Sequence, residues 1–296
     1  MLELLTMIKQ TLREAVIEAG NKKVAIGHFN VSDSTGVWAV FNAARKLNVP
    51  VIIGVSEGER DFIGVRQIVA LVKSIREEFD YPVYLNADHT YTFERVRQAI
   101  DAGFDSVIFD GAKLSLEENI TQAKECVVYA KASGRDVLVE GELGYIGQSS
   151  KILDAIPEGV DLDEVSLTHP EDARRFVEET GVDLLAPAVG NIHGMLKGGS
   201  NPSLNIEVVK KVREASGVPL VLHGGSGNSA DDFKKAIASG VDIVHINTEL
   251  RVAYKKGIML SLQENPEEVA PYKFFKQGLQ NMTKLVEEKL TLFNNL

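Results

Sequence analysis

Short runs of β-branched and other apolar residues alternate with amphipathic segments along this chain, and this alternation limits the possible folds more than any other feature. Eight runs have the length of a strand. They are Val24–Phe29, Val49–Val55, Val83–Asn86, Ser106–Phe109, Val137–Glu142, Leu184–Ala188, Pro219–Leu222 and Ile243–Ile246. Because segments of helical period lie between them, the repeated order of strand and helix predicts a parallel sheet in an α/β fold.

The connecting segments repeat as well. Four similar segments each join the end of a helix, marked by glycine, to the next strand. They are AGFDSVIFD, TGVDLLAPA, SGVPLVLH and SGVDIVHI. The expected helices include Phe93–Ala102, Leu116–Ala132, Glu171–Glu179, Ile206–Ala215 and Ala230–Ala238. Such a sheet can stay open and doubly wound or close into a barrel, and the count of eight equivalent units favours closure. We predict a (β/α)8 TIM barrel with extra N- and C-terminal helices.

The length of 296 residues could hold two domains or one large barrel. We find no linker, low-complexity stretch or break in composition, so we predict one domain over residues 1–296, with a C-terminal helical extension over about 266–296. At the N-terminus, apolar residues recur at helical spacing among acids and bases, which predicts an amphipathic helix rather than a signal peptide. These residues are Leu4, Leu5, Ile8, Leu12 and Val16.

Charge and cysteine content exclude several kinds of partner. Lysine and arginine total 32 against 42 aspartates and glutamates, a net charge of −10, which disfavours bulk attraction to nucleic acid or to an anionic membrane. No window approaches the roughly 18 apolar residues of a membrane span. The single cysteine, Cys126, cannot form an intrachain disulfide, which suits the cytoplasm, and we expect it to be a small buried residue of a helix.

Polar side chains gather where the predicted strands end, which is where barrels of this kind carry their active sites. Five of the six histidines lie at or just beyond such ends, namely His28, His89, His193, His223 and His245. Unrelated structural histidines have no reason to share one rim. The sixth, His169, stands where a helix begins, with Thr168 as a possible cap and Pro170 in the first turn, and we interpret it as local structure.

Three converging neutral imidazoles form a good site for zinc, which in catalytic centres takes three protein ligands and keeps one position open. We assign His89, His193 and His223 to this role. Asp88, beside the first, could act as a general acid or base or could orient an imidazole, and the residues alone leave both roles open. Glu140 and Glu142 are two apart on a strand, so both face the barrel interior, where paired acids need a cation or donors.

Glycine-rich loops follow two of the same strands. They contain Gly194, Lys197, Gly224, Gly225 and Ser226, and backbone N–H groups in such loops can hold a phosphate. Asn247 and Thr248, at the end of the last strand, would complete the site with the helix that follows.

Five motifs follow one another along the chain: LNADHT, VEGELG, NIHGMLKGG, VLHGGSG and HINTELR. Together, and over the whole chain, they resemble those of the class II metal-dependent fructose-bisphosphate aldolases. Tagatose-bisphosphate aldolases belong to the same family. The resemblance implies reversible aldol cleavage of a ketose 1,6-bisphosphate, with fructose 1,6-bisphosphate as the first candidate, to dihydroxyacetone phosphate and glyceraldehyde 3-phosphate. It also implies that one Zn²⁺, replaceable by Co²⁺ or a similar ion, is bound by the three histidines.

The resemblance gives roles to further residues. Asp88 matches the group that takes the C4 hydroxyl proton, which settles its role towards catalysis, and Glu142 matches an alternate metal ligand. Gly194, Thr248 and the segment Gly224–Ser226 match the dihydroxyacetone-phosphate site, often with Na⁺ or K⁺ nearby. Two more matches are Ser56, with a substrate-contacting serine, and Arg251, with an arginine that reaches a neighbouring subunit to bind the distal phosphate. A homodimer or homotetramer is implied.

Four departures keep the sugar open. His245 replaces an asparagine that contacts substrate, and Asn247 stands where aspartate accompanies fructose and alanine accompanies tagatose substrates. The loop after VEGELG lacks the usual glycine-rich stretch with its acid, leaving Asp154, Glu158 or neither to replace it, and His28 replaces a small residue. The alternatives are another ketose-phosphate aldolase, a metal-dependent sugar-phosphate isomerase or epimerase using His245 as an added base, and a non-catalytic relative. A lysine Schiff base is disfavoured because no lysine ends a predicted strand.

Overall fold

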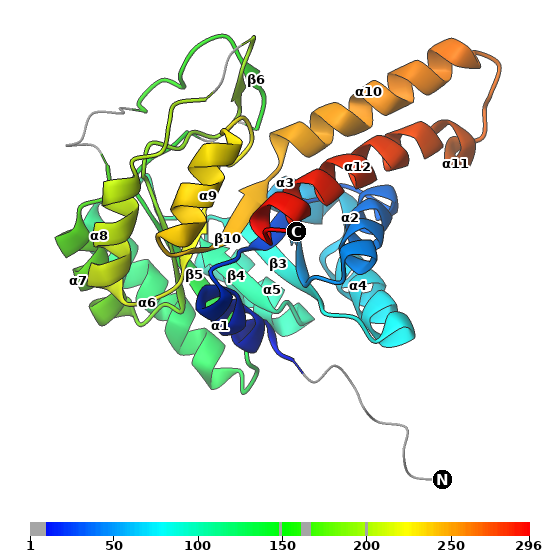
Figure 1. Ribbon diagram of the computed structural model, residues 1–296. Helices are drawn as coiled ribbons and strands as arrows, with labels where there is room; N and C mark the ends of the chain where they lie inside the picture. Colours follow the sequence, from blue (N-terminus) through cyan, green and yellow to red (C-terminus); the bar gives the residue numbers. More distant parts are fainter. Residues whose placement is uncertain (1–9, 148–149, 161–166, 199–200) are drawn as a thin grey trace.

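The computed structural model describes residues 10–147, 150–160, 167–198 and 201–296. Its principal sheet is a closed barrel in the order β1-β10-β9-β7-β5-β4-β3-β2, and each neighbouring pair is parallel. The strands are β1 (Ile26–Asn30), β2 (Val51–Val55), β3 (Val83–Thr90), β4 (Ser106–Phe109), β5 (Leu138–Leu143), β7 (Leu184–Pro187), β9 (Leu220–Leu222) and β10 (Val241–Ile246). The predicted eight-stranded barrel is confirmed (Figure 1).

The barrel is surrounded by amphipathic helices. They are α2 (Ser34–Leu47), α3 (Glu57–Ile63), α4 (Val65–Phe79), α5 (Phe93–Ala102), α6 (Leu116–Ala132), α7 (Pro170–Thr180), α8 (Ile206–Ser216) and α9 (Ala230–Ala238). Side-chain caps at Thr92, Ser115, Asn205 and Ser229 start four of them where the sequence pattern predicts. The predicted bounds of α5, α6 and α9 are those observed, because a cap at one end and an apolar stripe facing the barrel leave little freedom.

The strand β3 is longer than the sequence pattern indicates. It was expected to end at Asn86 but continues to Thr90 through an irregularity in its pairing with β4 between Ala87 and Thr90. Within this bulge His89 has a left-handed backbone, with φ of 39°. Alternation along a regular strand does not anticipate such a bulge, which here re-aims two neighbouring polar side chains at the end of the barrel.

The helix α1 (Leu12–Lys22) closes the amino-terminal end of the barrel. Leu12 and Val16 pack there against inward-facing strand residues such as Ile52 and Val221. Thr11 caps the helix in a reciprocal capping box with Glu14. The predicted N-terminal helix is confirmed over this part, whereas Leu4, Leu5 and Ile8 lie outside the described residues.

Two long helices form an arm beyond the barrel. The chain runs out along α10 (Thr248–Glu264), turns through α11 (Pro271–Phe274) and returns along α12 (Lys276–Phe293), as Figure 1 shows. Gly257 and Gly278 lie against each other where α10 and α12 cross, and a side chain at Gly257 would meet the Gly278 backbone at 2.6 Å. The far end of α12 packs on the barrel with Leu290 and Phe293 buried, so helices occupy the predicted C-terminal extension.

Smaller predictions concern Cys126, the start of α7 and membrane-spanning helices. Cys126 is a fully buried free thiol on α6, as predicted. Pro170 does begin α7, but Thr168 is not its cap: His169 occupies the cap position, and the Thr168 hydroxyl instead donates to the Leu143 carbonyl and accepts from Ala188 N–H. The expected cap is wrong because this hydroxyl ties two neighbouring strand ends together. Among the described residues, no helix is both long and apolar enough to cross a membrane.

Candidate active site

The predicted gathering of polar residues at the carboxyl ends of the strands is confirmed. One pocket there is lined by His89 from β3, His193 from the loop after β7, His223 directly after β9 and His245 from β10. Its other lining residues are Asn30, Asp88, Ser150, Gly194, Gly224, Ser226, Asn247 and Thr248. The fifth histidine, His28, lies fully buried in β1.

Three of these imidazoles present converging nitrogens. His89, His193 and His223 each offer a ring nitrogen within 4.8 Å of the others. The ring centroid of His89 lies 4.7 Å from that of His193 and 5.0 Å from that of His223. A shared position between three rings, two of them buried and that of His89 partly buried, is the geometry that a tetrahedral ion with one open position requires.

The second nitrogen of each ring is held by an acceptor outside the cluster. His89 Nδ1 lies 2.9 Å from Asp110 Oδ2, and His223 Nε2 lies 2.8 Å from Glu140 Oε1. His193 Nδ1 lies 2.6 Å from the Gly147 carbonyl. When each ring gives its proton to its acceptor, the opposite nitrogen faces the centre and can bind a metal ion, and His223 Nδ1 is buried without a hydrogen bond. This donor set fits a zinc ion.

Acidic groups surround the same centre. Burial lowers the pKa of His89, but the carboxylates of Asp88, Asp110 and Glu142 outweigh it and raise that pKa to about 10. Burial also raises the pKa of Glu142 well above its ordinary value. Its unpartnered Oε2 lies 3.8 Å from His89 Nδ1 and 3.9 Å from His223 Nδ1. The negative field that draws a proton to His89 also favours a divalent cation, and Glu142 stands beside that position.

Asp88 is buried at the centre of the pocket. Its Oδ2 accepts a hydrogen bond of 2.8 Å from Asn30 Nδ2, whereas its Oδ1 has no hydrogen bond and lies 3.4 Å from His245 Nδ1. Burial raises the pKa of the Asp88 carboxyl, but the charge of His89 beside it holds that pKa well below its ordinary value. Arg60 donates to the Asp88 carbonyl and fixes the backbone. Asp88 therefore presents one ionised, uncommitted oxygen to the pocket, as a general base requires.

His28 and His245 form a stacked pair beneath the pocket. Their ring centroids are 3.4 Å apart and their planes differ by 2°, because the two residues face each other in the register of β1 and β10. His28 fits only because Gly54 leaves room: a Cβ there would lie 2.0 Å from His28 Cε1. One ring nitrogen from each and a carboxylate oxygen of Asp88 also lie within 4.8 Å of one another, and His28 Nε2 is 3.1 Å from Asn86 Oδ1.

The glycine-rich loops meet the N-terminus of α10. Gly194 and Gly224 have left-handed backbones, and a Cβ at Gly224 would lie 2.3 Å from the Ile192 carbonyl oxygen. Ser226 Oγ accepts from Asn247 N–H and Glu249 N–H at 3.3 and 3.2 Å, which brings this loop to the first turn of α10. Gly225 lies in the same turn, and its N–H donates to the His245 carbonyl.

Some candidates lie apart from the pocket. Lys197 is 75% exposed and lies 3.7 Å from Asp154, beside the small sheet of β6 (Ile152–Leu153) and β8 (Met195–Leu196). Asp154 and Glu158 are exposed and do not line the pocket. The structure therefore does not bring these three side chains to the histidine cluster.

Ser56 and Arg251 come together at a residue that sequence reasoning missed. Ser56 Oγ donates to Glu59 Oε2 at 2.9 Å, and Arg251 Nη2 donates to Glu59 Oε1 at 2.6 Å. Glu59 also accepts from Asn30 Nδ2 at 3.0 Å. The sequence did carry a signal, because Ser56 and Glu59 have the spacing of a capping box directly after a strand.

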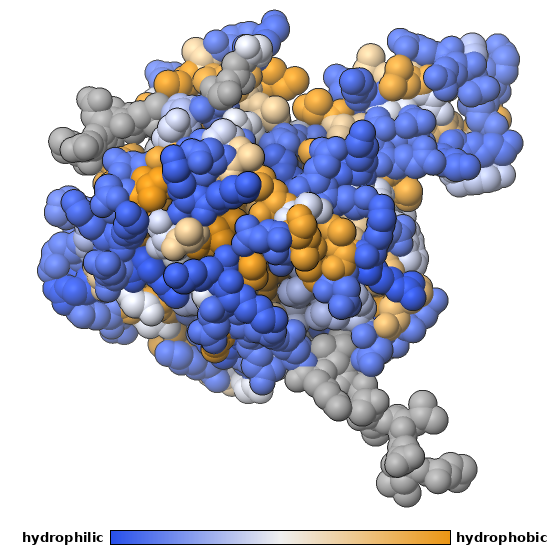
Figure 2. Space-filling view, in the orientation of Figure 1, coloured by the Kyte–Doolittle hydropathy of each residue, from blue (hydrophilic) through white to orange (hydrophobic). Residues whose placement is uncertain are grey.

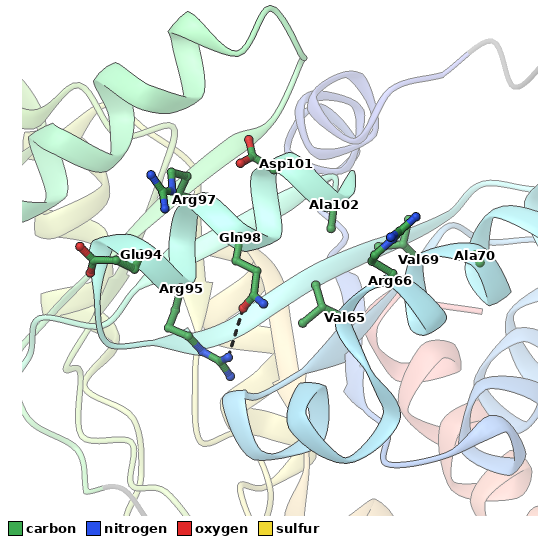
Figure 3. Close-up of a pocket in the computed structure, with 10 residues that line it drawn as sticks. All are labelled: Val65, Arg66, Val69, Ala70, Glu94, Arg95, Arg97, Gln98, Asp101 and Ala102. Carbon is green, nitrogen blue, oxygen red and sulfur yellow. Dashed lines mark hydrogen bonds between the residues drawn. The ribbon is translucent and has the colours of Figure 1, made fainter.

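A larger hollow lies outside the barrel between α4 and α5 (Figure 3). Arg95 and Gln98 form a hydrogen bond with each other there, and Arg95 also pairs with Asp61. Its charged side chains do not converge on one point, unlike those at the strand ends.

Comparison with known proteins agrees with this geometry. Residues 10–296 match the model of the family described as fructose-bisphosphate aldolase class-II. A fructose-bisphosphate aldolase of Geobacillus stearothermophilus is 35% identical over 288 residues, covering 96% of each chain. A probable fructose-bisphosphate aldolase of Bacillus subtilis (strain 168) is also 35% identical, covering 96% of this chain and 97% of that protein. The crystal structure of the YdjI aldolase from Escherichia coli K12 superposes with a TM-score of 0.79 at 33% identity, covering 95% and 96% of the two chains.

Proposed function

Since the chain belongs to the class II fructose-bisphosphate aldolase family and is an aldolase of the carbon–carbon lyase class, we propose that it cleaves fructose 1,6-bisphosphate reversibly to dihydroxyacetone phosphate and glyceraldehyde 3-phosphate. The observation that carries this proposal is the convergence of one ring nitrogen from each of three histidines beside Asp88 Oδ1, which accepts no hydrogen bond. Aldol chemistry needs a site that polarises the substrate carbonyl and a base beside it that moves a proton.

We propose that His89 Nε2, His193 Nε2 and His223 Nδ1 hold the metal, with Glu142 as an alternate ligand. Zn²⁺ bound there supplies Lewis-acid polarisation of the substrate carbonyl, and Co²⁺ would serve similarly. Asp110, Glu140 and the Gly147 carbonyl keep each ring in the required tautomer. Their contribution is to hold the three ligands ready before substrate arrives.

Asp88 carries the proton in the proposed cleavage. Its Oδ1 takes the proton of the C4 hydroxyl, the bond between C3 and C4 breaks, and the aldehyde leaves with the C4 carbonyl. The electron pair left on C3 of the dihydroxyacetone-phosphate fragment then takes a proton from water, and Asp88 gives its own proton to water before the next cleavage. In condensation Asp88 returns its proton to the new hydroxyl. Asn30 holds the other carboxylate oxygen, and His245, which faces Oδ1 at 3.4 Å, is proposed to contact substrate oxygen.

The phosphate of dihydroxyacetone phosphate is proposed to sit among Gly194, the segment Gly224–Ser226 and Thr248, with Asn247 beside it. Positive φ at Gly194 and Gly224 and the N-terminus of α10 support this place. Na⁺ or K⁺ nearby is part of the proposal.

We also propose that the enzyme works in the cytoplasm as a homodimer or homotetramer. The cytoplasm is supported by the single cysteine, Cys126, which is buried as a free thiol, as suits a reducing compartment. The arm supports the second point, because it exposes apolar side chains on an otherwise hydrophilic surface: Val269 is 86% exposed and Met259 is 50% exposed, while Figure 2 shows hydrophilic residues over most of the arm.

The test is a product assay on purified enzyme of measured metal content. Fructose and tagatose 1,6-bisphosphates and a panel of ketose monophosphates are supplied in turn. Release of triose phosphate from fructose 1,6-bisphosphate, lost on chelation and restored by Zn²⁺ or Co²⁺, is the expected result. Full activity without metal would refute the metal role, and faster cleavage of the tagatose isomer would replace the proposed sugar.

A further inference from the structure

Glu59 is a buried carboxylate at the side of the site, and the proposed reaction does not use it. It belongs to the first turn of α3, directly after β2. Oε2 accepts from Ser56 N–H at 2.8 Å, from Ser56 Oγ at 2.9 Å and from Asn30 Nδ2 at 3.0 Å. Oε1 accepts from Arg251 Nη2 at 2.6 Å. A carboxylate with this many donors is a fixed negative charge.

This charge lies one side chain away from Asp88. The same Asn30 amide nitrogen donates to Glu59 Oε2 and, at 2.8 Å, to Asp88 Oδ2. A ketose with its C1 phosphate in the glycine-rich loops and its C4 hydroxyl at Asp88 extends C5 and C6 past Asp88. We place C5 and C6 along the wall formed by Asn30, Ser56 and Glu59, because the Asn30 amide joins Asp88 to Glu59 on that side.

Arg251 is the cation that meets this wall: the resemblance implies an arginine that reaches a neighbouring subunit, whereas in the structure its guanidinium pairs with Glu59 of its own chain. Its side chain is 42% exposed, and its Nη2 is paired with Glu59. A phosphate on C6 that approached the guanidinium would also meet the negative charge of the Glu59 carboxylate beside it, whereas an uncharged hydroxymethyl group would not be repelled. Arg60, the next residue along α3, is not a substitute, because its guanidinium donates to backbone carbonyls of Val55 and Asp88.

We propose that Glu59 is a specificity-determining residue: as the internal counterion of Arg251, it weakens recognition of a phosphate at the distal end of the ketose. This inference rests on the proposed aldolase function. It assigns to the enzyme a broader substrate class, in which ketose 1-phosphates with an uncharged distal end compete effectively with 1,6-bisphosphates.

The test compares two substrates on the zinc-loaded enzyme. For wild type and E59Q, kcat/KM is measured with fructose 1,6-bisphosphate and with fructose 1-phosphate. Freeing Arg251 should raise the bisphosphate-to-monophosphate ratio about tenfold or more, mainly through a lower KM for the bisphosphate. An unchanged or lower ratio in E59Q would overturn the proposal.

A double variant tests the mechanism. In E59Q/R251Q the gain should disappear, because the guanidinium that makes it is absent. If the ratio stays raised, Glu59 acts by direct repulsion and the counterion role is wrong. The matched control is D61N on the same helix, where Asp61 pairs with Arg95 and is 63% exposed. The bisphosphate-to-monophosphate ratio of D61N should equal that of wild type. If the ratio rises in D61N as much as in E59Q, the effect comes from the change in net charge alone and the assignment of Glu59 is refuted.

A single variant guards against misfolding of E59Q. R251Q in the wild-type background should lower the ratio less than tenfold, because its charge is already committed to Glu59; a larger loss would show that Arg251 is free to bind phosphate and would overturn the proposal. Failure of the proposed function is distinct, since then neither ketose would release triose phosphate from the metal-loaded wild type.

Discussion

The hydrogen bond between Glu140 and His223 gives the sharpest test of the metal centre. Both side chains are 1% exposed, and 2.8 Å separates Glu140 Oε1 from His223 Nε2. Glu140→Leu would leave a buried N–H without an acceptor, at a cost of about 1–3 kcal/mol. Because the ring can then move its proton to Nδ1, the nitrogen assigned to the metal, this cost falls on metal binding. We expect zinc affinity to fall about 10- to 100-fold.

The assay is competition for zinc against a chelator of known affinity at fixed pH. Glu140→Gln is the matched control, since its amide oxygen can still accept from Nε2–H, and its zinc affinity should stay within about threefold of wild type. Asp110→Leu should imitate Glu140→Leu through His89. Unchanged zinc affinity in Glu140→Leu, with the fold intact by circular dichroism, would refute the assignment of the metal-binding nitrogens.

Three further predictions follow from the site and its support. Asp88→Ala should lower turnover by about 10²-fold or more with unchanged zinc content; near-normal turnover would reject its role. Gly54→Ala should destabilise the fold by at least about 1–3 kcal/mol in chemical denaturation, because its Cβ would lie 2.0 Å from His28, and His28→Ala should rescue it. Burial raises the pKa of Asp242 from 3.8 to about 6, so its neutral form favours folding. That stability is present below pH 4 and is lost by up to about 3 kcal/mol as pH rises through 6. Asp242→Asn should flatten this part of the stability–pH curve, and an unaltered curve would contradict the shift.

The barrel and the convergence of the three histidines could be predicted from sequence, because both depend on periodic or local features. Strand length, helix caps and glycines fix where each unit begins and ends. In a parallel barrel every strand ends at the same rim, so a polar residue at a strand end is placed by topology alone. His89, His193 and His223 follow from that rule without knowledge of the register.

Contacts between strands could not be predicted in the same way. The stack of His28 on His245 depends on their pairing across β1 and β10, two strands that are first and last in the sequence. The space that His28 occupies depends on Gly54 in β2. A glycine within a strand does not indicate in the sequence which side chain will fill the space beside it. Glu59 could not be predicted for another reason: its spacing from Ser56 is already accounted for by a capping box, and its contacts with Asn30 and Arg251 depend on the packing of distant segments.

The charge of the site alters the expected means of phosphate binding. In a chain of net charge −10, Lys197 and Arg251 were the side chains expected to supply local positive charge. Lys197 lies away from the pocket beside Asp154, and Arg251 is paired with Glu59. Under the proposed function we therefore expect anion binding at the pocket to depend on the proposed metal and on the backbone where the Gly224–Ser226 turn meets the N-terminus of α10. Backbone dipoles are fixed by the fold and cannot be neutralised by a rotating carboxylate, so the proximal phosphate should be recognised more strictly than any charge at the distal end.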